Sequence, residues 1–106
     1  MSSSEAGARP DYAYKKLRKA LVILSTSSGS LRNRLGTAWV NEGRKADGAL
    51  PLGELADRYE WIHKMLNSRS NVGSVRATID QLTDGELRGI AEELVAVTLA
   101  LAKERG

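Results

Sequence analysis

One glutamate and one histidine in this sequence have a spacing that metal sites use. Glu60 and His63 form a Glu-x-x-His pair, and residues three apart lie side by side on a helix. Helical di-metal sites need two such pairs and two further carboxylates, but this chain has a single histidine. By helical angle the pair lies away from the apolar stripe that contains Ile62. We therefore expect both side chains to face solvent and to hold neither a metal nor a cofactor.

The other reactive side chains do not form a catalytic group either. The chain has no cysteine, and a lone surface histidine leaves no credible pair of nucleophile and base. Carboxylates come in pairs at Asp57/Glu60 and at Glu92/Glu93, but such pairs on helices are usually solvated. Nothing in the sequence places a second acid in an apolar pocket that would raise a pKa. The sequence therefore favours a protein that is not an enzyme.

A loop of small residues precedes the second helical segment. The stretch 27–32 reads Ser-Ser-Gly-Ser-Leu-Arg, and helix N-termini attract anions through free N–H groups and the helix dipole. The chain lacks the Gly-x-x-x-x-Gly-Lys-Ser/Thr pattern of nucleotide-binding loops, and no strand leads into the loop. We interpret it as a helix cap and turn.

Positive charge is concentrated in the first half of the chain. Residues 1–53 contain nine Lys or Arg against four Asp or Glu, whereas residues 54–106 contain seven against nine. The cations best placed to contact an anionic partner are Lys15, Lys16, Lys19, Arg32 and Arg34. They could steer an acidic protein towards this surface. The alternative is a nucleic-acid-binding regulator, because residues 11–45 loosely resemble a helix-turn-helix with an unusually long, six-residue connection.

Two helical segments lose their polar side. Residues 21–24 read Leu-Val-Ile-Leu, and residues 94–102 are apolar apart from one threonine. A helix that is apolar all round must be surrounded by other surfaces. In a chain of 106 residues, part of that covering surface can belong to a second protein. Enclosure within the chain's own bundle is the competing interpretation for the last helix.

The leading functional prediction is therefore association with another protein chain. We expect Val95, Val97 and Leu99 to point away from the buried face of the last helix. Trp and Met are residue types enriched at interface centres. The residues predicted to make apolar contact are Val22, Ile23, Trp61, Met65, Val95 and Leu99. Such a protein would act as a homodimer, as a regulator, or as an inhibitor of a larger assembly.

The first two helices are expected to form an antiparallel pair. The first should span residues 11–25, with Asp11 as its N-cap and an apolar stripe of Tyr14, Leu17, Leu21 and Leu24. A second should follow Ser30 as N-cap and present Leu31, Leu35, Ala38 and Trp39 on one face. Gly43 is expected to end it in the left-handed conformation, followed by a loop to residue 50.

Three more helices are predicted in the second half. Pro51 is suited to the first turn of a helix whose stripe would be Leu52, Leu55, Tyr59, Ile62 and Leu66. A turn at residues 67–71 and a short helix around residues 75–82 should follow. Thr83 and Glu86 form a capping-box pattern that opens a last helix reaching about residue 104.

The predicted fold class is all-α, a compact bundle of four to five helices that are mostly antiparallel and joined by short loops. Residues 1–10 are expected to form a disordered polar tail, and residues 11–106 a single helical domain. The first ten residues have no apolar core of the kind found in signal peptides. The longest apolar stretch is far shorter than the roughly 20 residues of a membrane-spanning helix. We therefore expect a cytoplasmic protein with no membrane contact.

Overall fold

The computed structural model describes residues 9–67 and 74–105. All regular structure in these residues is helical, which confirms the predicted fold class. The elements are α2 (Pro10–Thr26), α3 (Leu31–Asn41), the 3₁₀ helix η1 (Gly43–Ala46), α4 (Glu54–Asn67), α5 (Val75–Gln81) and α6 (Asp84–Arg105). The predictions for residues 1–8, for the turn at 68–71 and for residue 106 lie outside the described residues.

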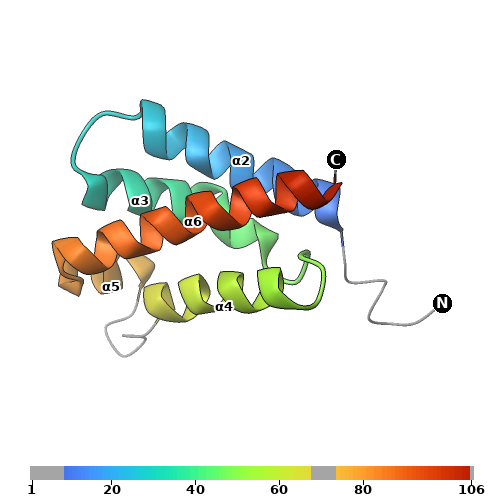
Figure 1. The fold of residues 1–106 in the computed structure, drawn as a ribbon. Coiled ribbons are helices and arrows are strands. Elements are labelled where there is room, and N and C mark those ends of the chain that lie inside the picture. Colours follow the sequence, from blue (N-terminus) through green and yellow to red (C-terminus); the bar gives the residue numbers. More distant parts are fainter. Residues whose placement is uncertain (1–8, 68–73, 106) are drawn as a thin grey trace.

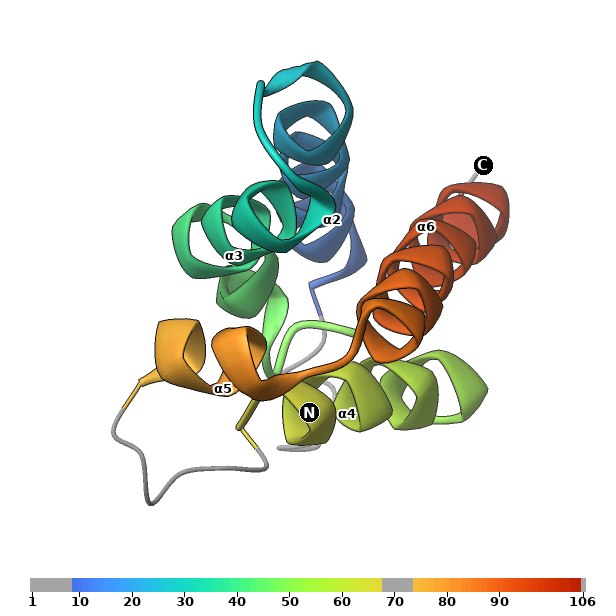
Figure 2. The same ribbon diagram turned by 90° about the vertical axis from the view of Figure 1, so that its left-hand side faces the viewer.

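The long helices run in alternating directions. α2 and α3 form an antiparallel pair, and α6 returns antiparallel to both α2 and α4 (Figure 1). Viewed along the bundle, α6 lies between α2 and α4 on one flank, and α5 lies at one end (Figure 2). α6 is thus supported on two sides and leaves its third side outermost.

The core forms where the apolar stripes of the helices meet. Trp39 is its largest fully buried side chain, and its ring lies 5.6 Å from the ring of Tyr59, centroid to centroid. The Tyr59 hydroxyl donates a hydrogen bond to the carbonyl of Gly43 at 2.9 Å. This bond satisfies the one polar atom of a buried phenol and joins α4 to η1.

The N-cap of α2 lies two residues before the predicted one. Arg9 occupies the N-cap position without a side-chain hydrogen bond, and Pro10 is the first helical residue. Proline fits there because its fixed φ suits the helix and its missing N–H has no intrahelical partner to lose. Asp11 is therefore not the N-cap; it lies in the first turn, where a negative charge favours the helix dipole.

The buried stripe of α2 also differs slightly from the prediction. Its fully packed residues are Ala13, Leu17, Ala20 and Leu24. Tyr14 and Leu21 are half-buried at one edge of this stripe. The small side chains of the two alanines let neighbouring helices approach closely, so the centre of the stripe shifts towards them.

The predicted left-handed terminator at Gly43 is wrong. Ser30 caps α3 as expected, with its hydroxyl accepting from the N–H of Asn33 at 3.1 Å. Gly43, however, does not have a positive φ and instead begins η1, within the segment predicted to be a loop. A Cβ at this residue would lie 2.7 Å from the Trp39 ring. Gly43 is therefore required by packing rather than by backbone conformation.

α4 starts later than the proline signal suggested. Its first residue is Glu54, so Pro51 and Leu52 precede the helix. Gly53 has φ +123°, a conformation that interrupts a helix and favours glycine. Leu52 is consequently 79% exposed rather than part of the stripe, whereas Leu55, Tyr59, Ile62 and Leu66 are buried as predicted.

The N-terminus of α6 confirms the predicted capping box. The Thr83 hydroxyl accepts from the N–H of Glu86 at 3.1 Å, and the Glu86 carboxylate accepts from the N–H of Thr83 at 2.8 Å. Further along the helix, the prediction that Val97 faces outward is wrong, because Val97 is fully buried. It lies three residues after Leu94 and four before Leu101, which is the spacing of the buried helix face.

Candidate interaction surface

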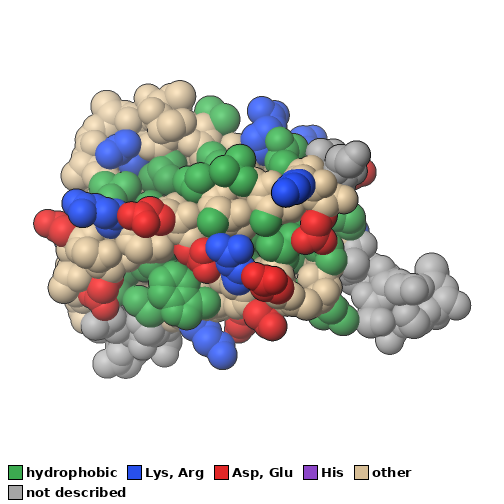
Figure 3. Space-filling model, in the orientation of Figure 1, with side chains coloured by type: hydrophobic (Ala, Val, Ile, Leu, Met, Phe, Trp, Pro, Cys, Tyr) green, Lys and Arg blue, Asp and Glu red, His purple; other side chains and the backbone are tan. Residues whose placement is uncertain are grey.

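Five large hydrophobic side chains are exposed in the described residues. They are Val22 (47%), Leu52 (79%), Trp61 (45%), Val95 (37%) and Leu99 (63%). Hydrophobic side chains gather along the seam between α2 and α6, and a separate hydrophobic area lies on the α4 side of α6 (Figure 3). Four of these five residues, all but Leu52, belong to the set predicted for apolar contact.

The outermost side of α6 carries two of them. Its exposed residues recur at intervals of three or four, which places them in one line along the helix. We call this line the α6 ridge; it consists of Arg88, Glu92, Val95, Leu99 and Lys103. The buried residues occupy the opposite side of the same helix. A helix that packs on both flanks thus still presents an apolar centre to solvent.

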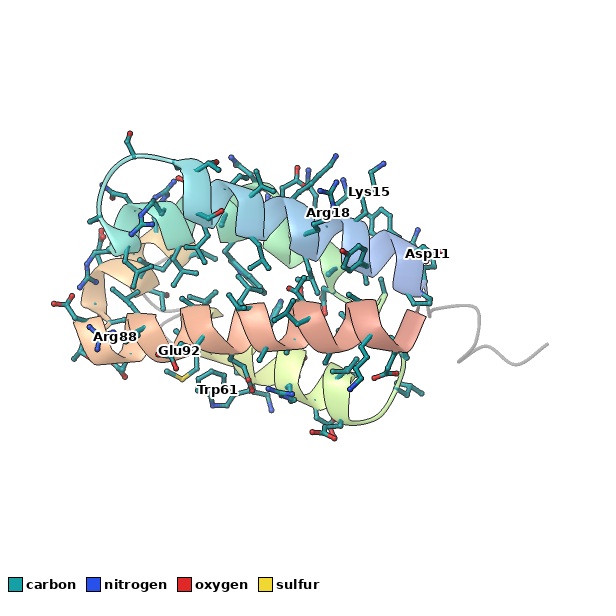
Figure 4. All side chains as sticks on the ribbon, turned by 45° about the horizontal axis from the view of Figure 1, so that its top comes forward. Asp11, Lys15, Arg18, Trp61, Arg88 and Glu92 are labelled. Atoms are coloured by element: carbon teal, nitrogen blue, oxygen red, sulfur yellow. The ribbon has the colours of Figure 1, made fainter. Side chains whose placement is uncertain are left out.

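The outer side of α2 has a different character. Lys15 and Arg18 are exposed there (Figure 4), and Lys19 is half-buried. Val22 and the half-buried Ile23 line a shallow groove of about 410 Å³ together with Arg18, Lys19 and Glu42. The two hydrophobic residues are therefore surrounded by charged groups.

Trp61 lies beside α6 rather than within the core. It lines a shallow groove of about 480 Å³ with Gly89, Glu92, Glu93 and Ala96. Figure 4 shows Trp61 of α4 beside Glu92 of α6, with Arg88 further towards the start of α6. Met65, which was predicted to flank the same surface, is half-buried and packs against the core.

An ion pair spans α4 and α6 beside this groove. Arg58 donates to both carboxylate oxygens of Glu93, at 2.6 and 3.2 Å. The hydrogen bond lowers the pKa of the Glu93 carboxyl and raises the pKa of the Arg58 guanidinium. Glu93 is thereby paired within the chain, whereas the neighbouring Glu92 is exposed on the α6 ridge.

The two arginines predicted to contact an anionic partner hold the fold together. Arg32 donates to the carbonyls of Ile79 and Leu82, the latter at 2.8 Å, and pairs with Asp84 at 3.3 Å. Arg34 donates to the carbonyl of Leu24 at 2.9 Å. Both guanidinium groups therefore satisfy backbone carbonyls at the ends of helices.

The three lysines of α2 do not share one environment. Lys16 is half-buried and pairs with Glu42 at 3.6 Å. Lys15, by contrast, is exposed, and Lys19 borders the groove beside Val22. The structure does not bring the five predicted cations onto one surface, because α3 directs Arg32 towards α5 and Arg34 towards the end of α2.

The prediction that Glu60 and His63 both face solvent is confirmed for Glu60 only. Glu60 is exposed, but His63 is half-buried. The imidazole lies 3.9 Å from Asp47 and near the rings of Trp39 and Tyr59. Among residues 9–67 and 74–105, no three His, Cys, Asp or Glu side chains are grouped so that they could hold a metal ion.

None of the helices in the described part of the chain combines the length and the apolar character needed to cross a membrane. Comparisons of the chain with protein-family models, with curated proteins and with solved structures find no match. Its candidate surface must therefore be interpreted from its own residues.

One property of the surface was missed from the sequence. Glu92 and Lys103 lie at the two ends of the apolar pair on the α6 ridge. Their spacing was detectable, because positions 88, 92, 95, 99 and 103 follow helical intervals. The outward position was predicted for the apolar Val95 and Leu99 but not for the charged residues in line with them.

Proposed function

We propose that this chain is a non-enzymatic protein that acts by associating with another protein chain through the α6 ridge. The observation that carries the proposal is the exposure of Leu99 and Val95 at the centre of a helix that is already packed on both flanks. Exposed apolar centres bordered by polar residues are typical of protein interfaces.

The state of the ionisable groups supports a binding role over a catalytic one. Among the residues that the structure describes, the groups whose pKa clearly departs from its ordinary value are Arg58, Tyr59 and Glu93. Arg58 and Glu93 bind each other, and the hydroxyl of Tyr59 donates to a backbone carbonyl. The pairing of Arg58 with Glu93 shifts the pKa of both groups, and burial raises the pKa of Tyr59, so all three shifts have structural causes.

Nucleic-acid binding through residues 11–45 remains the alternative, and it has less support. Arg32 and Arg34 already bind backbone carbonyls, which leaves Lys15, Arg18, Arg44 and Lys45 as the exposed cations of this segment. A double variant, Lys15→Glu with Lys19→Glu, should leave association through α6 intact. If the wild type retards nucleic acid in a gel at low salt and this variant does not, the result favours the alternative.

Cross-linking in the cells that produce the protein tests the proposal directly. Leu99 would be replaced by the photo-reactive residue benzoyl-phenylalanine, and the exposed Asn41 of α3 by the same residue as a matched control. We expect a cross-linked protein product from position 99 and not from position 41. Absence of a product at position 99, or equal products at both positions, would refute the proposal.

A further inference from the structure

The α6 ridge has an ordered pattern of charge. Read from the N-terminus, an acid at Glu92 precedes the apolar pair Val95 and Leu99, and a base at Lys103 follows it. All four side chains are exposed. At 1.5 Å per residue the ridge from Arg88 to Lys103 is about 22 Å long. The stretch of the ridge from Glu92 to Lys103 therefore has an acidic end, an apolar centre and a basic end, and the basic Arg88 lies one turn before the acid.

This order of charges is complementary to the same order read in the opposite direction. Placing a second ridge antiparallel to the first brings the acidic end of each opposite the basic end of the other. A parallel arrangement would bring Glu92 opposite Glu92 and Lys103 opposite Lys103, and like charges at such contacts are unfavourable. Antiparallel helices also align their dipoles favourably.

From this pattern we infer that the α6 ridge binds the α6 ridge of a second copy of this chain, antiparallel and about a two-fold axis. The inference rests on the proposed function and names the partner. In this arrangement Val95 of one copy lies beside Leu99 of the second copy, and the reverse contact is equivalent by symmetry. Glu92 then lies within one residue of Lys103 of the second copy.

The flanks of the ridge suit close approach of another helix. On α6 itself the ridge is bordered by the half-buried Ala96, Ala100 and Ala102, and the exposed Trp61 of α4 lies beside Glu92 and Ala96 at one flank. Interhelical distances of about 8–10 Å are typical of packed helices. The nearby Glu93 is already paired with Arg58, which leaves Glu92 as the acid available to the second copy.

The size of the ridge determines how strongly two copies bind. A standard interface buries about 800 Å² on each partner, and a single ridge of about 22 Å provides less than this. We therefore expect a dimer that dissociates on dilution, with a dissociation constant in the micromolar range. Association should be visible at high concentration and lost at low concentration.

Sedimentation equilibrium of the purified chain, at low salt and over about 5 to 500 µM, tests the inference. The wild type should change from the 11.5 kDa monomer to twice that mass. Glu92→Lys and Lys103→Glu should each weaken the dimer about tenfold, because each places two like-charge contacts in the symmetric interface. The double variant Glu92→Lys with Lys103→Glu should return to within about threefold of the wild type.

The matched control changes a charge away from the ridge. Lys64 of α4 is exposed, and Lys64→Glu should leave the dissociation constant unchanged. A monomer at every concentration overturns the inference, and so does a double variant that binds no more tightly than the single variants. Circular dichroism of each variant identifies any loss of binding that comes from unfolding.

Introduced cysteines test the orientation, since the chain has none of its own. An equimolar mixture of Glu92→Cys and Lys103→Cys should oxidise mainly to the mixed disulfide. A predominance of the two symmetric disulfides would overturn the antiparallel arrangement. The cross-linking experiment at position 99 separates this inference from the proposed function. A product with a different protein and none with the chain itself would refute the second copy but keep association, whereas no product would refute both.

Discussion

α2 and α6 bury their inner sides in the same way and differ on their outer sides. α2 buries Ala13, Leu17, Ala20 and Leu24, and α6 buries Leu87, Ile90, Leu94, Val97 and Leu101, with intervals of three and four in both. The outer side of α2 carries exposed cations together with Val22, whereas that of α6 has Val95 and Leu99 at its centre and charged residues towards its ends. The inner spacing fixes the helices in the bundle, and the outer residues determine what each can contact.

The neighbours of the two helices explain part of this difference. α2 packs on α3, η1 and α6, and α6 packs mainly on α2 and α4. An outward side chain on either helix adds little to the core, so its type is not constrained by folding. The exposed leucine and valine on α6 are the residues that the proposed association would use.

The largest expected effects on stability come from the buried inner sides of α2 and α6, and they test whether the two sides contribute equally. Leu17→Ala in α2 and Leu94→Ala in α6 should each lower the free energy of unfolding by about 3 kcal/mol, because both side chains are fully buried. Urea denaturation followed by circular dichroism measures both. A loss below about 1 kcal/mol at either residue would show that one helix contributes less to the core.

A second prediction separates the cations that stabilise the fold from those that are free. Arg32→Gln should lower the free energy of unfolding by about 2 kcal/mol, because it removes charged hydrogen bonds to the carbonyls of Ile79 and Leu82. Arg18→Gln on the exposed side of α2 is the matched control and should cost less than about 0.5 kcal/mol. Equal losses would contradict the structural role assigned to Arg32.

Local sequence was sufficient for the inner side of α4 and for the N-cap of α6, but not for contacts between distant segments. The stripe of α4 from Leu55 to Leu66 and the capping box at Thr83 follow from short-range rules, and both are confirmed. The role of Gly43 depends on the ring of Trp39. Such a steric requirement has no signal in the neighbouring residues.

The same limit applies to the candidate surface. Val95 and Leu99 were placed outside by helical angle, and they are exposed. Arg32, however, binds carbonyls 47 and 50 residues away, so its commitment to the fold could not be inferred from the pattern around it. Val97 was misplaced because the apolar run in α6 hides which side of the helix is buried.

Tyr59 belongs to α4, which packs against α6, and its hydroxyl binds η1, which packs against α2. It therefore connects the elements that support these two helices. Tyr59→Phe should lower the free energy of unfolding by about 1 kcal/mol near pH 8. Burial raises the pKa of the Tyr59 hydroxyl, so the folded chain keeps this proton above about pH 10 while the unfolded chain loses it. This contribution is therefore present below pH 10 and lost as the pH rises.

The measurement is the difference in unfolding free energy between wild type and Tyr59→Phe at pH 9 and pH 11. That difference should shrink by about 1 kcal/mol over this interval, because only the wild type carries the titrating group at this residue. A constant difference would show that the hydroxyl is equally accessible to hydroxide in both states. The link between η1 and α4 would then be looser than its 2.9 Å hydrogen bond indicates.

The smallest stability effect should come from the α6 ridge itself. Leu99 is 63% exposed, so Leu99→Gln should change the free energy of unfolding of the dilute monomer by less than about 0.5 kcal/mol. Lys15→Gln on the outer side of α2 is the matched change and should be equally mild. If the ridge binds a second copy, the melting temperature of the wild type and of Lys15→Gln should rise with protein concentration, because the dimer forms only from folded chains. That of Leu99→Gln should not rise, and a parallel rise in all three would mean that the contact lies on another surface.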